Sequence, residues 1–140
     1  NNIGLGGVSL EFGGVANAFE YLPYDVEWYR CLRYLYVLDG DLVTSSPLAL
    51  GVATSATVAD TYRALPVRMR AVPTLTATAA EWEIDEIASA IACTVLVLGS
   101  GSSTDAIRLT ATVAAGLTQY RFANLRSLAP GGKAILSAEL

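Results

Sequence analysis

A short run of carboxylates around a tryptophan, Glu-Trp-Glu-Ile-Asp-Glu at residues 81–86, is the densest polar cluster in a sequence of which only 16% is charged. The face of an indole ring can stack on a sugar ring, and carboxylates accept hydrogen bonds from sugar hydroxyls. The side chains of Glu81, Trp82, Glu83 and Asp85 therefore form a candidate ligand-binding site for a glycan. The alternative is a solvated loop between two strands, with the ring of Trp82 folded into the core.

The same cluster does not suit catalysis. Two carboxyl groups that act as acid and base need environments that separate their pKa values, whereas residues 81, 83 and 85 on one strand would share one exposed face. The sequence has no histidine, which excludes Ser-His-Asp and Cys-His catalysis and removes the commonest ligand of transition metals. We therefore expect no enzymatic activity, no catalytic residue and no cofactor.

Three smaller motifs have simple structural explanations. Asp39-Gly40-Asp41 offers two carboxylates to a Ca²⁺ ion, which is too few, and Asp-Gly is first of all a turn dipeptide. The glycines at 4, 6 and 7 resemble part of a nucleotide-binding pattern but lack a phosphate-binding lysine and a following helix. Cys31 and Cys93 belong to no CxxC pair, so both are expected to be buried free thiols, with a disulfide between them as the alternative. The sequence predicts no metal site.

The composition favours a protein partner over a membrane or a nucleic acid. A length of 140 residues suits one domain, and 53% of the residues are hydrophobic. The sequence has no run of about 20 apolar residues that could span a bilayer, and it does not open with a secretory signal sequence. A net charge of -4 gives no basic footprint for a nucleic acid. Formation of an oligomer is therefore the best explanation of the apolar surplus.

Hydrophobic periodicity predicts a chain built mostly from strands. One strand is expected within residues 4–14, and a short helix at about 24–31 with Asp25 as its N-cap. Further strands are expected at 33–38, 48–54, 59–67, 73–80, 88–98, 106–114, 117–124 and 133–140, with residues 99–104 as a loop. A helix is the alternative for residues 86–98. The predicted fold class is all-β, an antiparallel β-sandwich or jelly-roll-like fold with one short N-terminal helix.

Residues 21–36 hold five of the seven tyrosines. A domain of this size could hardly bury so many large rings, whereas Tyr, Trp and Arg are enriched at subunit interfaces. We therefore expect Tyr24, Trp28, Tyr29, Tyr34 and Tyr36 to pack between subunits. Burial in the core of the domain and stacking on a ligand are the alternatives.

Two blocks of the sequence resemble the segment near the C-terminus of many tailed-bacteriophage tail-fibre and related virion proteins. Residues 8–36 are similar to the string QLE-G-ATPFE-RPY-E-LCQRYY of that family, and the matching residues are Leu10, Glu11, Gly14, Ala16, Phe19, Glu20, Pro23, Tyr24, Glu27, Cys31, Arg33 and Tyr34. Residues 53–76 are similar to the family's A-x-S-A-T and P-V-x-MRA-x-PT strands, with matches at Leu65, Pro66, Val67, Met69, Arg70, Ala71, Pro73 and Thr74. The closing residues 137–140, Ser-Ala-Glu-Leu, are similar to a DAEL terminus. Leu32 departs from the pattern, since it stands where the family usually has Gln.

The resemblance implies the C-terminal module of a virion appendage. Residues 1–22 would then be a leader strand and linker from a preceding module, and residues 23–140 the C-terminal β-sandwich domain. Such fibres are typically homotrimers, so the expected partners are two further copies, other virion proteins and polysaccharide of the host surface. The expected function is adhesion to host glycans without enzymatic activity. The alternative is a purely structural trimerisation, capping or decoration module that binds no receptor.

Overall fold

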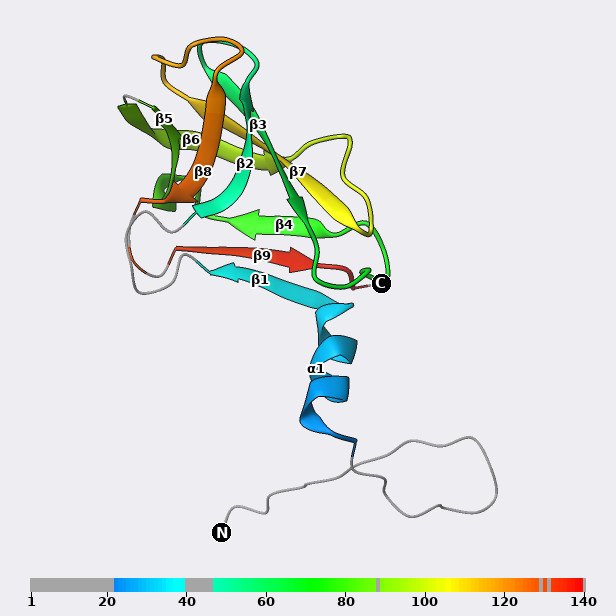
Figure 1. The fold of residues 1–140 in the computed structure, drawn as a ribbon. Coiled ribbons are helices and arrows are strands. Elements are labelled where there is room, and N and C mark those ends of the chain that lie inside the picture. Colours follow the sequence, from blue (N-terminus) through cyan, green and yellow to red (C-terminus); the bar gives the residue numbers. More distant parts are fainter. Residues whose placement is uncertain (1–21, 40–46, 88, 129, 131, 140) are drawn as a thin grey trace, which may run out of the picture.

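The computed structural model describes residues 22–39, 47–87, 89–128, 130 and 132–139 (Figure 1). The chain forms one α-helix, one short 3-10 helix and nine strands within these ranges: α1 (Tyr24–Leu32), β1 (Leu35–Asp39), β2 (Pro47–Ala53), β3 (Val58–Ala64), β4 (Thr74–Ala77), η1 (Ala79–Glu81), β5 (Trp82–Glu86), β6 (Ser89–Leu98), β7 (Ala106–Val113), β8 (Phe122–Ser127) and β9 (Lys133–Ser137). Six strands close a barrel in the order β2-β3-β7-β6-β5-β8, and the other three form a sheet in the order β1-β9-β4. Every strand pair in both sheets is antiparallel.

This architecture confirms an antiparallel, mostly β fold with one short helix. The more specific sandwich or jelly-roll arrangement is not confirmed, because six of the strands close into a barrel. The strand expected within residues 4–14, the glycines at 4, 6 and 7, and Gly40-Asp41 of the expected turn lie outside the described residues. The division of the chain at residue 22 stays a prediction.

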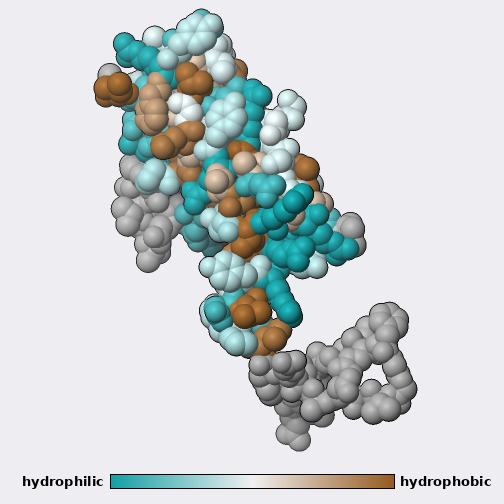
Figure 2. Space-filling view, turned by 45° about the vertical axis from the view of Figure 1, so that its right-hand side comes forward, coloured by the Kyte–Doolittle hydropathy of each residue, from teal (hydrophilic) through white to brown (hydrophobic). Residues whose placement is uncertain are grey.

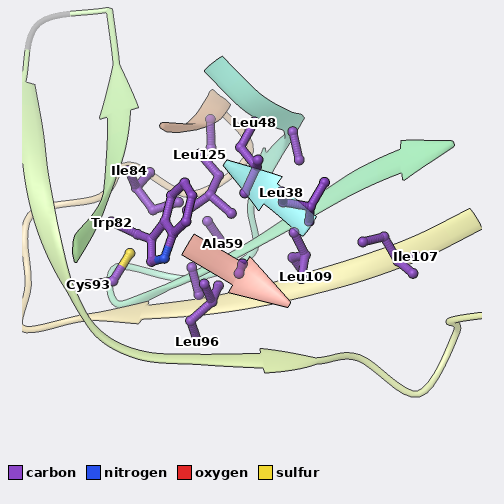
Figure 3. Packing of buried hydrophobic residues seen from close by; sticks show 14 of the residues in the cluster. Leu38, Leu48, Ala59, Trp82, Ile84, Cys93, Leu96, Ile107, Leu109 and Leu125 are labelled. Atoms are coloured by element: carbon purple, nitrogen blue, oxygen red, sulfur yellow. The ribbon is translucent and has the colours of Figure 1, made fainter. Parts of the chain in front are cut away.

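Alternating burial explains why the barrel strands form. Along β7 the side chains of Ile107, Leu109, Ala111 and Val113 are buried, while the polar residues between them face outward. The same period-2 pattern runs along β8 and β9, as expected for strands with one face toward a core. The buried side chains of the barrel and of the three-stranded sheet belong to one cluster, which Figure 3 shows with the indole of Trp82 among them.

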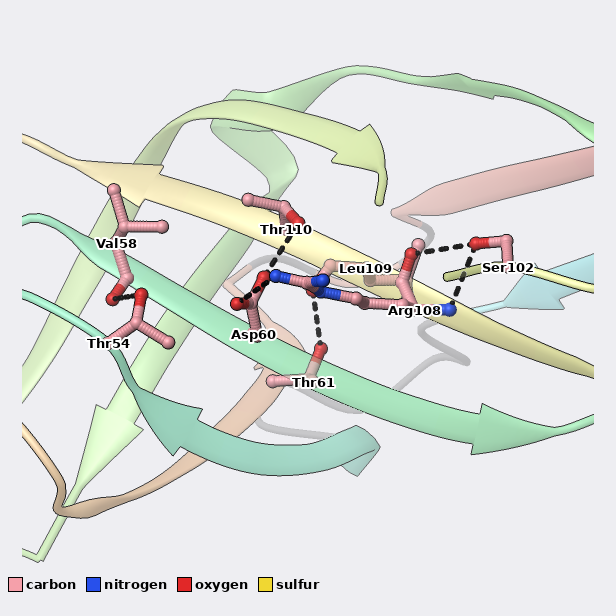
Figure 4. Close-up of polar contacts among 8 residues, drawn as sticks. All are labelled: Thr54, Val58, Asp60, Thr61, Ser102, Arg108, Leu109 and Thr110. Carbon is pink, nitrogen blue, oxygen red and sulfur yellow. Dashed lines mark hydrogen bonds and ion pairs between the residues drawn. The ribbon is translucent and has the colours of Figure 1, made fainter. Parts of the chain in front are cut away.

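A buried ion pair joins β3 to β7. The carboxylate of Asp60 accepts hydrogen bonds from the guanidinium of Arg108 and from the hydroxyl of Thr110, the latter at 2.7 Å (Figure 4). The side chain of Asp60 is 6% exposed and that of Arg108 31%. The hydrogen bond from Arg108 holds the pKa of Asp60 below its usual value, against the opposing effect of burial.

The starts of helix α1 and of strand β8 differ from the sequence prediction. Helix α1 begins at Tyr24 after Pro23, and no side chain caps it, so Asp25 lies in the first turn and is not the N-cap. The expected strand at 117–124 begins only at Phe122, because Tyr120 adopts a left-handed backbone with φ 67° in the preceding turn. Residues 89–98 form strand β6, so the helical alternative for this segment was wrong.

The three-stranded sheet connects the barrel to α1. Strand β9 lies between β1 and β4, and α1 leads directly into the outer strand β1. Figure 1 shows α1 on the far side of this sheet, standing off the barrel. This placement leaves most of the helix surface without contact to the core, since Leu32 is its one buried residue.

Candidate functional site

The tryptophan expected to stack on a sugar is part of the core. Trp82 opens strand β5 and is 0% exposed, and Figure 3 shows its ring beside Ile84 and Cys93. In the described part of the chain its indole N–H has no hydrogen-bond partner. The prediction of Trp82 as a ligand-binding residue was therefore wrong, and the alternative, a ring folded into the core, is confirmed.

The carboxylates around Trp82 hold strands together instead of facing a ligand. Arg126 on β8 donates from Nε to Glu83 at 2.7 Å and from Nη1 to Asp85 at 3.0 Å. Glu83 is buried and Asp85 half-buried, and Glu81 accepts a hydrogen bond from the backbone N–H of Lys133 at 3.2 Å. One oxygen of each carboxylate therefore has a partner within the chain, and without the ring of Trp82 the predicted glycan rim at Glu81, Glu83 and Asp85 has no stacking face.

Helix α1 presents two opposite faces, as follows from about 3.6 residues per turn. On one face the rings of Tyr24 and Trp28 stack with centroids 6.1 Å apart. Tyr24 is 79% exposed and Trp28 51%. Cys31 lies three residues after Trp28 and so on the same helix face. Its thiol is exposed, so the expectation of a buried thiol was wrong for Cys31.

The remaining tyrosines of the expected interface have different environments. Tyr29 is 56% exposed and lies on the opposite face of α1. Tyr34 is 43% exposed, and the guanidinium of Arg70 lies 5.6 Å from the centre of its ring. Tyr36 is half-buried and its hydroxyl accepts a hydrogen bond from Arg63 at 3.3 Å. Tyr36 is thus part of the domain's own packing.

A groove with a volume of about 650 Å³ lies between α1 and the loop that follows β3. Eight residues line it: Val26, Tyr29 and Arg30 from α1, Arg33 directly after the helix, and Val67, Arg68, Met69 and Arg70 from the loop. The first four of these residues are spaced at i, i+3, i+4 and i+7, which places them on a single helix face. Figure 2 shows hydrophobic surface on α1 and hydrophilic surface where the helix meets the rest of the molecule.

Backbone hydrogen bonds fix the two walls of the groove to each other. The N–H of Arg70 donates to the carbonyl of Arg33 at 2.9 Å, and the N–H of Met69 donates to the carbonyl of Thr104 at 2.8 Å. The end of the described chain joins them, since the N–H of Ala138 donates to the carbonyl of Tyr34 at 2.8 Å. Backbone hydrogen bonds beside this groove therefore link residues 31–34 both to residues 65–74 and to residues 137–139.

The groove concentrates positive charge in an acidic chain. Four of the nine Lys and Arg residues line it. Arg68 lies 3.9 Å from Asp105 in an exposed pair, and such pairs are weak. Among the residues that the structure describes, Arg30, Arg33 and Arg70 have no carboxylate within ion-pair distance.

The chemistry available at this groove is binding. Guanidinium groups donate pairs of parallel hydrogen bonds to carboxylate, phosphate or sulfate groups, and four of the eight lining residues are arginines. Over the described ranges no cluster of His, Cys, Asp and Glu could hold a metal ion. Within the same ranges no helix has the length and hydrophobicity needed to span a membrane.

The groove was not predicted from the sequence, although both segments that line it contain residues of the recognised motifs. Arg33 and Arg70 belong to the two motifs that carry the resemblance, but no periodicity links residues this far apart in the chain. The spacing of Val26, Tyr29, Arg30 and Arg33 is the sequence signal that could have revealed this helix face.

The chain matches no protein-family model, no curated protein and no solved structure.

Proposed function

We propose that this chain is a non-enzymatic module of a bacteriophage tail fibre or related virion appendage, and that it assembles with further copies of itself through α1. In this proposal residues 23–140 form the C-terminal module and residues 1–22 link it to a preceding one. The motifs at 8–36 and 53–76 support the family, and the exposed ring pair of Tyr24 and Trp28 supports the mode of assembly.

The ring pair carries the argument because α1 cannot be stable by its own propensity. Helices shorter than about 12–15 residues are marginal in water unless a face packs against something. Helix α1 has nine residues and buries one of them, Leu32. A partner that covers Tyr24 and Trp28 would supply the missing packing, and large aromatic side chains are the residues that dominate interface energetics. Three copies around an axis, as the resemblance implies, would place the three helices together.

Light scattering on the purified chain tests the assembly. We expect the molar mass of an oligomer, and specifically that of a trimer. The double variant Tyr24→Ser/Trp28→Ser should have the molar mass of a monomer. The matched control is Tyr62→Ser/Phe122→Ser, which removes two rings of similar exposure, 55% and 51%, from the outside of the barrel. A monodisperse monomer for the unsubstituted chain, or an equal shift for both double variants, would contradict the proposal.

Adhesion to the host surface is a second candidate function, favoured by the arginine-lined groove and no longer by Trp82. The assembled chain would then bind bacterial surface polysaccharide on a glycan array. If the assembled chain binds no glycan on the array, its role is purely structural: trimerisation, capping or decoration.

A further inference from the structure

We propose that the groove between α1 and residues 67–70 binds an acidic sugar of a polysaccharide, with the anionic group on the arginines and the sugar ring against Tyr29. The first argument is charge. The chain has a net charge of -4, yet four guanidinium groups line this one groove. An anion bound among them would relieve the mutual repulsion of like charges.

Three of the five cationic side chains outside the groove have carboxylate partners. Arg108 is paired with Asp60, Arg126 with two carboxylates of β5, and Lys133 lies 3.9 Å from a carboxylate oxygen of Asp39. Arg63 donates instead to the carbonyl of Leu48 and the hydroxyl of Tyr36, and Arg121 has no ion pair among the described residues. What distinguishes Arg30, Arg33 and Arg70 is that three such guanidinium groups line one groove.

The apolar part of the lining selects a sugar over a bare anion. Tyr29 is 56% and Val26 38% exposed, while Met69 is 2% exposed and lies at the base of the loop wall. An aromatic ring next to apolar side chains suits the C–H face of a pyranose, and the polar groups fix its orientation. Sites for small molecules have volumes of about 300–1,000 Å³, and a groove of about 650 Å³ falls in this range.

The walls are already arranged before a ligand arrives. Arg70 is held by its backbone hydrogen bond to Arg33 and by the contact of its guanidinium with Tyr34. A site that needs no ordering on binding loses less affinity to conformational entropy. Clusters of arginines also recognise acidic peptide segments, so an acidic peptide is the competing ligand in the test below.

Titration calorimetry with trigalacturonate, an acidic trisaccharide, tests the site on the full chain. We expect binding that weakens as salt is added, and no binding of the neutral trisaccharide maltotriose. The variant Arg30→Gln should lower the affinity by about tenfold and Arg30→Gln/Arg33→Gln by about a hundredfold, because each lost charge-assisted hydrogen bond accounts for roughly tenfold. Arg121→Gln is the matched control for the single variant, since it removes one charge from an exposed residue outside the groove and should leave the affinity unchanged.

Several results would overturn the proposal: equal binding of maltotriose, equal loss with Arg121→Gln, or tighter binding of inorganic phosphate than of trigalacturonate. Tighter binding of hexaglutamate would assign the groove to an acidic protein segment instead. Thermal melting shows whether the double variant is folded. If the double variant does not fold, Arg68→Gln, a change at an exposed side chain, replaces it.

The role of the groove in adhesion rests on the second function proposed above. Light scattering on the same samples separates the outcomes, because an oligomer that binds no sugar refutes the groove alone, and a monomer that binds it refutes the assembly alone.

Discussion

The two cysteines have opposite environments, and their reactivity should differ accordingly. Cys93 is buried beside Trp82 in the core (Figure 3). Burial, with a smaller effect of the Glu83 charge, raises the pKa of its thiol to about 12. Only the thiolate reacts readily with disulfide reagents, so Cys93 should stay unreactive while the chain is folded.

We therefore predict one reactive thiol per folded chain at about pH 8 in the monomeric variant Tyr24→Ser/Trp28→Ser, in which no partner covers Cys31, and two in denaturant. Titration with Ellman's reagent measures both numbers. Cys31→Ser should abolish the reaction of the folded chain, and Cys93→Ser should leave it unchanged. Two fast thiols in the folded chain would contradict the buried position of Cys93.

The pair of Asp60 and Arg108 predicts a pH-dependent stability. The pKa of Asp60 is lower in the folded chain than its usual value of 3.8, so the folded state binds the proton less tightly than the unfolded state. The ionised carboxylate therefore stabilises the fold above about pH 4, and this contribution is lost as the pH falls through the lower, folded pKa.

Asp60→Asn should lower the free energy of unfolding by about 1–2 kcal/mol at neutral pH, because the buried acceptor loses its charge-assisted hydrogen bonds. The difference from the unsubstituted chain should shrink below about pH 4. Asp105→Asn is the control, since the carboxylate of Asp105 is 64% exposed and lies 3.9 Å from Arg68. Urea unfolding at both pH values measures the effect, and an equal loss for both variants would refute the role of burial.

At the scale of single elements, the hairpin of β2 and β3 depends on one close approach of two backbones. Gly51 lies opposite Thr61 in the strand register. A Cβ atom added at Gly51 would lie 1.9 Å from the carbonyl oxygen of Asp60 and 2.6 Å from Cα of Thr61. Backbone atoms of a central strand cannot move away from such a contact without loss of strand pairing.

We predict that Gly51→Ala destabilises the chain by about 3 kcal/mol, the upper part of the range for overpacked sites. The control is Gly101→Ala, because a Cβ there meets its nearest neighbour, the Cδ of Arg108, at an ordinary 3.8 Å. Thermal unfolding of both variants compares them. A stability of Gly51→Ala equal to that of Gly101→Ala would show that the hairpin does not approach so closely.

The elements also show which parts of the structure could be predicted from the sequence. Strand β7 was predictable because apolar and polar residues alternate from Ile107 to Val113. Strand β5 was not, because alternating carboxylates on both sides of Trp82 indicate an exposed segment. The guanidinium of Arg126, 43 residues from Glu83 in the chain, neutralises them, and local patterns contain no information on such a contact. The groove was missed for the same reason, whereas the tyrosine-rich segment was correctly expected to be too large for one core.

At the scale of the whole molecule, stability should be distributed unevenly. Strands β3 and β7 pair along their whole length inside the barrel, while α1 stands outside it with one buried residue. Regions with few buried contacts open most easily. Hydrogen exchange should therefore be slowest in β3 and β7 and fastest in α1 when the protein is dilute.

If α1 forms the interface, its exchange should slow as the protein concentration rises, while exchange in β3 and β7 should not change. Exchange measured by mass spectrometry at two concentrations provides the comparison, with Tyr24→Ser/Trp28→Ser as the control in which α1 exchanges fast at both. Fast exchange of α1 at every concentration of the unsubstituted chain would contradict its burial between copies.

The position of β9 also determines the order in which the chain can fold as it is synthesised. Strand β9 lies between β1 and β4 and pairs with both, yet it follows every other described strand in the chain. All six barrel strands precede it in the sequence. The barrel can therefore close first, while β1 and β4 wait with unpaired edges that another chain could capture. The backbone contact of Ala138 with Tyr34, at the base of α1, can form only after all six barrel strands have been synthesised. Attachment of α1 and its groove to the module is thus completed after the barrel strands are made, and only then can neighbouring copies recognise the attached helix.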